Sequence, residues 1–365
     1  MKVINVTNLE NGVLNLERTD RHIREAEFRR MYQHFAVDAD DIVMASSGNS
    51  YSKTTVVRKQ DLPLVMNTSV IRFKPGKSTE YGYLWSFLNS WIFKDQIDLM
   101  ITGGAQPNFG PYHLKREFVP FPPLPEQRAI AGALGDVDAL LGVLTQLIAK
   151  KRDLKQAAMQ QLLTGKKRLP GFKGNWETKR LGDVATFFSG GTPSTAVADY
   201  YSGDIPWINS GDLNQAYIRE VTGRIAKQGL ENSAAKMIEP NTLLIALYGA
   251  TSGVTAVSKI KAAINQAVLA MIPHRDDTTF LYFKLVFLRD WLITTYTQGG
   301  QPNLSGDIIK SIELLMPPPK EQTAIAEVLS DMDAELAALE QRLAKTRDLK
   351  QGMMRELLTG RTRLV

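Results

Sequence analysis

The sequence has no cysteine and only four histidines among its 365 residues. Without cysteine there are no disulfides, thiolate zinc sites or cysteine nucleophiles, and four histidines leave little material for a histidine metal site. Residues 1–12 lack the apolar core of a signal peptide. No uninterrupted apolar run approaches the roughly 18 residues of a membrane span. We therefore expect a cytoplasmic protein with no membrane segment and no metal site.

The motifs of common nucleic-acid enzymes are also missing. The sequence contains no Asn/Asp-Pro-Pro-aromatic motif for amino-group methylation and no Gly-x-x-x-x-Gly-Lys-Ser/Thr loop for a nucleotide motor. The glycine-rich run Ser189–Ser194 has no strand–loop–helix context and is predicted to be a turn. No nucleophile, base and orienting group form a defensible catalytic set. The chain is therefore expected to bind rather than catalyse, and its modest net charge of +6 is compatible with nucleic acid.

A long internal repeat dominates what is present. Residues 122–169 return 195 positions later as residues 317–364, with 28 of 48 aligned positions identical and no gap. Each copy opens with prolines and closes with Leu-Leu-Thr-Gly. Glu126 and Glu321 fall in a first helical turn, where capping is the expected role, and Gly165 and Gly360 suit the left-handed position after a helix.

Apolar residues inside both copies recur at steps of three and four, which predicts a helix with a narrow seam for one partner helix. A helix of about 38 residues is about 57 Å long. The seam positions are Leu134, Val137, Leu141, Leu144 and Ile148 in the first copy, and Leu329, Met332, Leu336, Leu339 and Leu343 in the second.

Acidic residues gather in the first half of each predicted helix and basic residues in the second half. Parallel pairing would bring like charges together, whereas antiparallel pairing sets acidic against basic halves. Each surface pair is weak, but all signs favour the antiparallel arrangement. The alternative is two independent solvated helices.

The globular segments before the helices also repeat. Residues 4–9 match 208–213, 42–48 match 243–249, and the Gln-Pro-Asn blocks at 102–108 and 297–303 match each other. Short buried strands are expected at 41–46 and 243–248, further strands at 64–73 and 262–272, and apolar helical stretches at 81–99 and 279–296, which gives an α+β fold. The expected organisation is a first domain at 1–121, helix one at 122–169, a second domain at 170–316 and helix two at 317–365. Residues 175–206 have no counterpart before Ile4, so the first domain is expected to be short by about 30 residues.

Together these motifs resemble a known family. The repeated Pro-Pro-x-x-Glu-Gln-x-x-Ile helix ending in Leu-Leu-Thr-Gly, the Gln-Pro-Asn blocks and the Trp-x-x-x-x-Leu-Gly-Asp run at Trp176–Asp183 are similar to the specificity subunit of Type I restriction–modification systems. The resemblance covers essentially the whole chain, except that the first domain lacks a counterpart of residues 175–206, the lead-in segment of the second domain.

The resemblance implies two target recognition domains, each reading one half of a split double-stranded DNA target. It implies an antiparallel coiled coil that sets their spacing. A rod of about 57 Å could place the two domains about one helical turn of DNA, roughly 34–36 Å, apart. The resemblance also implies two modification subunits that bind S-adenosylmethionine, and restriction subunits that use ATP and Mg²⁺. No cofactor is expected on this chain.

Base reading needs polar donors and acceptors on exposed loops. The polar strand exit at residues 47–54 and its counterpart at 248–253 have that composition. The Gln-Pro-Asn blocks are expected to hold each domain to its helix instead. The candidate DNA-binding residues are Ser47, Gly48, Asn49, Ser50, Tyr51 and Lys53 in the first domain, and Tyr248, Gly249, Thr251 and Ser252 in the second.

Two alternatives remain open from the sequence. One is a coiled-coil assembly scaffold without a DNA role, which a salt-dependent DNA-binding assay would separate. The other is the recognition subunit of a related system whose partner combines cutting and methylation, which the adjacent genes would reveal.

Overall fold

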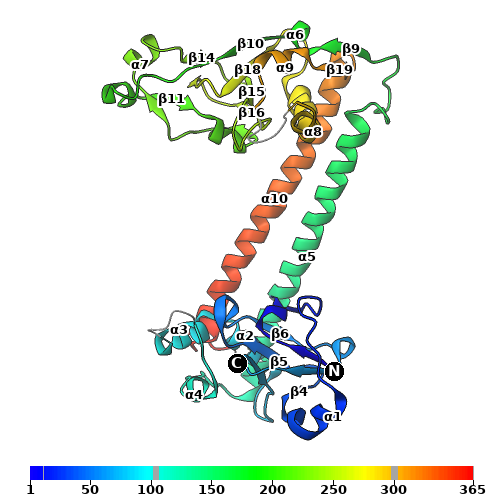
Figure 1. Ribbon diagram of the computed structural model, residues 1–365, viewed down its shortest axis with the longest axis vertical. Coiled ribbons are helices and arrows are strands. Elements are labelled where there is room, and N and C mark those ends of the chain that lie inside the picture. Colours follow the sequence, from blue (N-terminus) through cyan, green and yellow to red (C-terminus); the bar gives the residue numbers. More distant parts are fainter. Residues whose placement is uncertain (11, 102–106, 297–302, 365) are drawn as a thin grey trace. The chain divides into compact units, whose positions relative to one another are not determined.

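The computed structural model describes residues 1–10, 12–101, 107–296 and 303–364. The chain divides into two compact units, and each contains part of both long helices. Unit 1 is Met1–Gln146 with Gln341–Val365, and unit 2 is Leu147–Glu340. The long helices are α5, Leu124–Leu162, and α10, Pro319–Leu357, each of 39 residues, close to the length expected from the sequence (Figure 1).

Unit 1 holds two small sheets, ordered β1-β7-β4 and β6-β5-β8, and the hairpin β2-β3. Its central strand β5 is buried at all four positions, as expected for the apolar run after Asp41. The expected strand region 64–73 is split by a turn, because the Val70 N–H donates to the Asn67 carbonyl. The elements are β1 Lys2–Ile4, β2 Leu9–Glu10, β3 Val13–Leu14, α1 Glu25–Glu27, β4 Ala36–Val37, β5 Ile42–Ala45, β6 Thr54–Val56, β7 Leu64–Met66, β8 Val70–Phe73, α2 Tyr81–Leu88, α3 Trp91–Met100 and α4 Pro111–Leu114.

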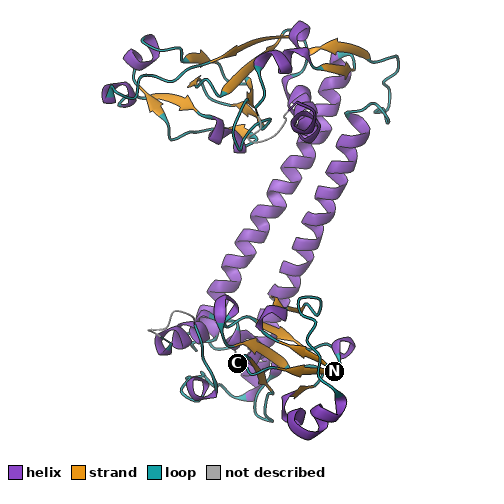
Figure 2. Ribbon diagram, viewed as in Figure 1, coloured by secondary structure: helices purple, strands orange, loops and turns teal. Residues whose placement is uncertain are grey.

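Unit 2 holds the sheets β10-β18-β15-β16-β12 and β13-β11-β17-β14 and the two-stranded ladder β19-β9. Figure 2 shows these strands in orange, with α8 among the helices in purple. The elements are β9 Glu177–Arg180, α6 Leu181–Val184, β10 Ala185–Ser189, β11 Ile205–Ile208, β12 Tyr217–Ile218, β13 Arg224–Ile225, α7 Lys227–Glu231, β14 Lys236–Ile238, β15 Leu243–Ala246, β16 Thr255–Ser258, β17 Ala262–Ile264, β18 Val268–Pro273, α8 Thr278–Tyr296, α9 Gly306–Ser311 and β19 Glu313–Met316.

The two units share the sheet topology that the sequence repeat predicts. β1 pairs with β7 in parallel as β11 pairs with β17, and β4 joins β7 antiparallel as β14 joins β17. β5 lies between β6 and β8 as β15 lies between β16 and β18. Unit 2 adds β10 beside β18 and β9 beside β19. The described part of unit 1 has no strand at either corresponding place.

One expected helix is interrupted. The apolar stretch 81–99 forms two helices, α2 and α3, rather than one. The break lies at Asn89–Ser90, where the Ser90 hydroxyl accepts a hydrogen bond from the Phe93 N–H and caps α3, as a serine before a helix commonly does. The corresponding region of unit 2 forms the single helix α8.

The predicted seam residues face protein rather than solvent. Leu134, Leu144, Ile148, Leu329 and Leu336 are buried, and the other five are half-buried. In unit 1, Ile130 and Leu134 of α5 pack with Met354, Leu357 and Leu358. In unit 2, Leu162 and Leu163 share a core with Ile325 and Leu329. Each buried leucine contributes roughly 1.5–3 kcal/mol to folding.

Ion pairs join the two helices within each unit. In unit 2 Lys151 pairs with Glu335 at 2.6 Å, and Lys155 pairs with Asp333. In unit 1 Lys350 pairs with Asp138 at 2.6 Å. Basic residues from the late part of one helix therefore meet acidic residues from the early part of the other.

Helix α5 is long and apolar enough to cross a membrane by length and composition, with a window of mean hydropathy 1.4. This is weak support for a membrane span, since helices that pack against protein pass the same test. The stretch also supplies the buried Ile130, Leu134 and Leu144, and its Asp138 is paired with Lys350.

Candidate nucleic-acid interface

The two predicted DNA-binding loops have the same backbone conformation. Residues 47–53 of unit 1 align with 248–254 of unit 2. Gly48 and Gly249 have φ of +69° and +82°, and Ser52 and Gly253 have φ of +62° and +74°. Glycine favours this left-handed region, and Ser52 adopts it within the same turn.

The backbone hydrogen bonds of the loops match one for one. The Tyr51 N–H donates to the Gly48 carbonyl at 3.0 Å, as the Ser252 N–H does to Gly249 at 3.0 Å. The loop is closed on its strand by Ser52 N–H to the Ala45 carbonyl at 2.8 Å, and in unit 2 by Gly253 N–H to the carbonyl of residue 246 at 2.9 Å. The two units therefore present one rigid frame at the end of β5 and of β15.

The side chains on this frame differ between the units. Asn49 is exposed where unit 2 has the exposed Ala250, and the half-buried Ser47 stands where unit 2 has Tyr248, which is 37% exposed. Half-buried positions are also occupied by Gly48, Ser50, Tyr51 and Lys53 in unit 1, and by Gly249 and Thr251 in unit 2.

Ser252 differs from the other predicted contacts. Its side chain is buried, and its hydroxyl donates to the Leu247 carbonyl at 3.0 Å. It therefore supports the loop from inside and has no free hydroxyl proton to offer a ligand in this conformation.

Tyr51 is fixed by α3. Its hydroxyl donates to Asp98 at 2.8 Å and accepts from Lys94 Nζ at 2.7 Å, and Lys94 also pairs with Asp98 at 2.6 Å. The hydrogen bonds to Asp98 and Tyr51 raise the pKa of Lys94 above its usual value. Lys94 is charged but paired with Asp98, so these contacts position Tyr51 and add no net charge beside the loop.

The described parts of the Gln-Pro-Asn blocks lie against these loops. Asn108 forms an antiparallel bridge with Ser47, and Asn303 forms one with Tyr248. The Gly48 N–H donates to the Pro107 carbonyl at 3.0 Å. The asparagines therefore hold the strand-exit loop, whereas the sequence suggested a role at the helix. Residues 102–106 and 297–302, which include Gln106, Gln301 and Pro302, lie outside the described residues.

Sequence reasoning missed one feature, a pair of buried glutamate–arginine contacts that we call the clasps. The Glu126 carboxylate accepts from Arg363 at 2.5 and 2.6 Å, and Glu321 accepts from Arg168 at 2.5 Å. Both carboxylates are buried, and Arg363 holds the pKa of Glu126 below its usual value. These glutamates therefore bind arginine side chains, where capping was the expected role. The repeated Arg-Leu that ends each copy was the available signal.

The glutamines after the clasp glutamates attach each domain to its helix. The side-chain Oε1 of Gln127 accepts a hydrogen bond from the Glu80 N–H at 2.8 Å, and the side-chain Oε1 of Gln322 accepts one from the Asp277 N–H at 2.9 Å. Their amides donate to the carbonyls of Pro122 and Pro317, each at 2.9 Å. The function expected of the Gln-Pro-Asn blocks is thus performed by these two glutamines.

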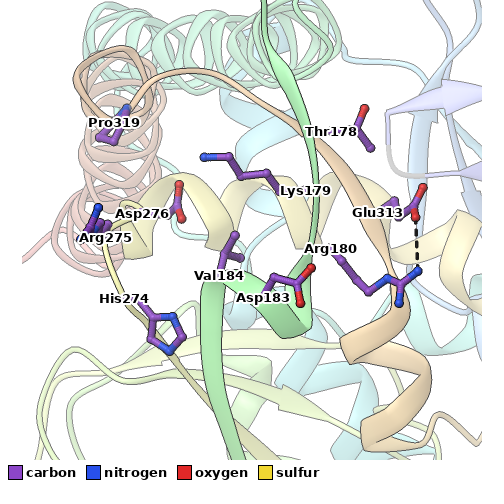
Figure 3. A pocket seen from close by; sticks show the side chains of 10 residues that line it. All are labelled: Thr178, Lys179, Arg180, Asp183, Val184, His274, Arg275, Asp276, Glu313 and Pro319. Carbon is purple, nitrogen blue, oxygen red and sulfur yellow. Dashed lines mark ion pairs between the residues drawn. The ribbon is translucent and has the colours of Figure 1, made fainter.

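Unit 2 also contains a polar cavity of about 740 Å³ that the sequence did not suggest. Figure 3 shows that β9, α6, β19, the segment before α8 and the start of α10 supply its side chains. Arg180 and Glu313 face each other across a 3.6 Å ion pair. The four other charged residues of the lining are two basic and two acidic, so the cavity offers little net attraction to phosphate. The lining residues are Thr178, Lys179, Arg180, Asp183, Val184, His274, Arg275, Asp276, Glu313 and Pro319.

Among the residues that the structure describes, no cluster of histidine and acidic side chains is arranged to hold a metal ion. The chemistry available at the loops is hydrogen bonding by amide, hydroxyl and backbone groups, together with the positive charge of Lys53.

Comparison with known proteins gives a consistent result. Residues 5–150 and 173–346 match the family model described as Type I restriction modification DNA specificity domain. The chain is 32% identical over 165 residues to the Type I restriction enzyme MjaIX specificity subunit of Methanocaldococcus jannaschii, covering 44% of this chain and 38% of that protein. It is 25% identical over 252 residues to the EcoR124I/EcoR124II specificity subunit of Escherichia coli, covering 66% and 61%. The chain therefore spans about two fifths and three fifths of the lengths of these relatives.

Solved structures share the fold. The crystal structure of the Type I restriction–modification S subunit from M. genitalium matches with a TM-score of 0.58 at 18% identity, covering 89% of this chain and 84% of that one. The chain thus shares a known fold of mixed strands and helices, and the family model accounts for most of the sequence. The chain belongs to the Type I restriction modification DNA specificity domain family.

Proposed function

We propose that this protein is the DNA sequence-recognition subunit of a Type I restriction–modification complex, and that each unit reads one half of a split target. The observation that carries the proposal is the pair of strand-exit loops, which share one backbone frame but differ in side chains at Asn49 and Ala250 and at Lys53 and Val254. Direct readout requires that kind of device, because side chains specify bases while a rigid frame positions them.

The loop of unit 1 supplies both kinds of DNA contact in the proposal. Asn49 is exposed and offers an amide, which can pair with a base edge. Lys53 suits a phosphate. The loop of unit 2 offers Tyr248 and Thr251 in place of charge, so the two half-sites would differ.

The test is DNA binding and methylation mapping of the chain assembled with its modification subunit. Lys53→Ala should weaken binding to all sequences and reduce the salt slope by about 1. Asn49→Ala should relax only the half-site read by unit 1. Lys59→Ala is the matched control, because Lys59 is an exposed lysine of unit 1 outside the loop. If the loop variants behave like this control, the assignment of the loops is wrong.

We also propose that the long helices form an antiparallel coiled coil, which spaces the readers and docks two modification subunits. The ion pairs within each unit support this pairing. Docking of the same partner twice is supported by an identical Arg-Asp-Leu-Lys-Gln segment in each helix, at 152–156 and 347–351. The leucine of this segment is exposed in both helices, with Leu154 at 48% and Leu349 at 58%. An exposed leucine adds little to the folding free energy, so a repeated one is available to a partner.

Substituting these leucines tests the docking. Leu154→Asp with Leu349→Asp should abolish copurification of the modification subunit and leave the melting temperature of the isolated chain unchanged. Leu140 is exposed, and the second copy of the repeat has Glu335 at the same position, so Leu140→Asp provides the control substitution. Retained assembly in the double variant would contradict the docking site.

In this proposal the chain itself catalyses nothing. S-adenosylmethionine would be bound by the modification subunits, and ATP and Mg²⁺ by restriction subunits, in the cytoplasm where the DNA lies. Turnover of any of these substrates by the purified single chain would contradict this division.

A further inference from the structure

Arg289, on α8 of unit 2, lies against the candidate DNA-binding loop of that unit. The loop turns back toward β16 at Gly253, which has φ of +74°. A Cβ placed on Gly253 would lie 3.3 Å from Cγ of Arg289 and 3.4 Å from the side chain of Ile293. The stem of the arginine therefore passes directly behind the loop, at a position where glycine leaves room for it.

The guanidinium of Arg289 has a donor that the domain does not satisfy. The side chain is half-buried, and its Nε–H is shielded from solvent without an acceptor among the described residues. The ion pairs recorded in the described part of unit 2 all join other side chains. A buried donor with no acceptor is uncommon, because it forgoes the free energy of its hydrogen bond. This arginine is therefore available to an incoming acceptor.

Unit 1 has a cation at the corresponding position. At the repeat offset of 195, Arg289 aligns with Lys94 of α3, and each lies beside the strand-exit loop of its own unit. Lys94 pairs with Asp98 at 2.6 Å and donates to the Tyr51 hydroxyl at 2.7 Å. The positive charge in unit 1 is therefore neutralised and held within the domain.

Unit 2 lacks both of these partners. Ile293 stands at the position of the aspartate, and Ser252 stands at the position of the tyrosine. The Ser252 hydroxyl donates to the Leu247 carbonyl at 3.0 Å, so it is engaged within the loop. The two units thus share a cation behind the loop and differ in whether the domain itself neutralises the charge.

The charge on the loop itself differs in the complementary sense. Unit 1 carries Lys53 at the end of its loop, where unit 2 has Val254. The ion pairs recorded around this loop in the described residues are those of Arg18 and Lys94, and neither involves Lys53. Each unit therefore presents one cation without an ion pair. It lies on the loop in unit 1 and behind the loop in unit 2.

We infer that Arg289 binds a phosphate of the DNA duplex beside the half-site that unit 2 reads, and thus provides the backbone contact that Lys53 provides in unit 1. The inference rests on the proposed function, because it needs the loop of unit 2 to lie on DNA. Arginine holds phosphate oxygens through a planar fork of donors, and the unsatisfied Nε–H is one donor of that fork. A phosphate contact suits a half-buried side chain, since reading a base requires a side chain that projects into a groove.

The test measures how the full chain, assembled with its modification subunit, binds a short duplex of unrelated sequence at several salt concentrations. Phosphate contacts are independent of sequence, so the recognised bases need not be known. Arg289→Gln should reduce the slope of log K against log salt by about 0.9, which corresponds to binding weaker by about fivefold at about 0.15 M salt. Arg289→Lys keeps the charge and should retain the wild-type slope.

A second variant and a matched control use the difference between the units. Ile293→Asp places in unit 2 the carboxylate that neutralises Lys94 in unit 1, and it should reduce the salt slope as Arg289→Gln does. Lys94→Gln combined with Asp98→Asn removes the neutralised cation together with its partner. This double variant leaves the net charge of unit 1 unchanged and should leave the slope unchanged. Melting temperatures establish that each variant is folded.

Methylation mapping with the same variants separates a phosphate contact from a base contact. Arg289→Gln should leave both recognised half-sites unchanged. A relaxed half-site for unit 2 would overturn the inference, because it would make Arg289 a base reader. An unchanged salt slope in Arg289→Gln, while Lys53→Ala reduces it, would also overturn the inference and leave the proposed function intact. An unchanged slope in both variants would reject the placement of DNA on the loops, and the inference with it.

Discussion

Removing Trp176 of unit 2 should weaken the clasp of that unit without breaking its glutamate–arginine pair. In Trp176→Ala, the glutamate at position 321 loses the indole donor at 3.2 Å, and the ring no longer covers Gly165. The helix ends stay in place, since Arg168 still pairs with Glu321 at 2.5 Å. The change therefore isolates the contribution of the lead-in to unit 2.

The size of the effect follows from the contacts. Replacing a fully buried tryptophan by alanine costs about 3–5 kcal/mol, and Trp176 is only half-buried. Packing should then account for roughly 2 kcal/mol. A hydrogen bond to a charged group adds about 1.5–3 kcal/mol, but such terms are not additive. We expect a loss of about 2–4 kcal/mol, or roughly 4–16 °C in melting temperature for a unit of this size.

Hydrogen exchange measured by mass spectrometry can assign this loss to one unit. Protection should fall in β9 and β19 and remain unchanged in β5 of unit 1. Trp291→Ala is the control, because Trp291 lies in α8 of the same unit and is 46% exposed. Equal effects of the two substitutions, or loss of protection in both units, would refute the reasoning.

Three further results are expected. Lys155→Glu should destabilise unit 2 by about 1 kcal/mol, because it places like charges at a pair that is 20% and 28% exposed, and adding Asp333→Lys should restore the loss in a chemical unfolding assay. Burial raises the pKa of Glu117 to about 7 from 4.5, so the folded state holds the proton more tightly. The free energy of unfolding should therefore fall by about 2 kcal/mol as pH rises from about 4.5 to about 7. In Glu117→Gln, unfolding curves at pH 5 and pH 8 should no longer show this difference in stability. Gly360→Ala should cost about 1–2 kcal/mol because of its positive φ, and Gly165→Ala should cost more, with the difference in melting temperature disappearing in the Trp176→Ala background.

The sequence predicted the parts of the fold that repeat at fixed spacing. The long helices, their glycine ends and the strands expected at 41–46 and 243–248 were recoverable, because hydrophobic period is a local signal and the repeat shows each pattern twice. The break at Ser90 was not, since an apolar stretch with helical spacing hides a single capping residue. The clasps were missed for a different reason. They join positions that are 237 and 153 residues apart, and no local pattern encodes such a contact.

For the candidate DNA-binding loops, the sequence predicted the position but not the conformation of the side chains and backbone. Their location after a buried strand followed from composition. The burial of Ser252 did not, because the same polar residue can point outward or bond back to its own loop. The shared backbone of the two loops also needed coordinates, since Ser52 adopts the positive φ that Gly253 adopts without any glycine in the sequence to signal it.

The chain segments that form each unit determine the order in which the two units can fold during synthesis. Unit 2 is one continuous segment, Leu147–Glu340, whereas unit 1 needs residues 341–365 in addition to 1–146. Those last residues bring Met354, Leu357 and Leu358 to the core around Tyr83 and Ile130, and Arg363 to Glu126. Domains commonly fold in the order of their synthesis, the N-terminal one first. Here the ribosome would release the first unit of the chain incomplete, and that unit would close its core only after the final turns of α10 had left the exit tunnel.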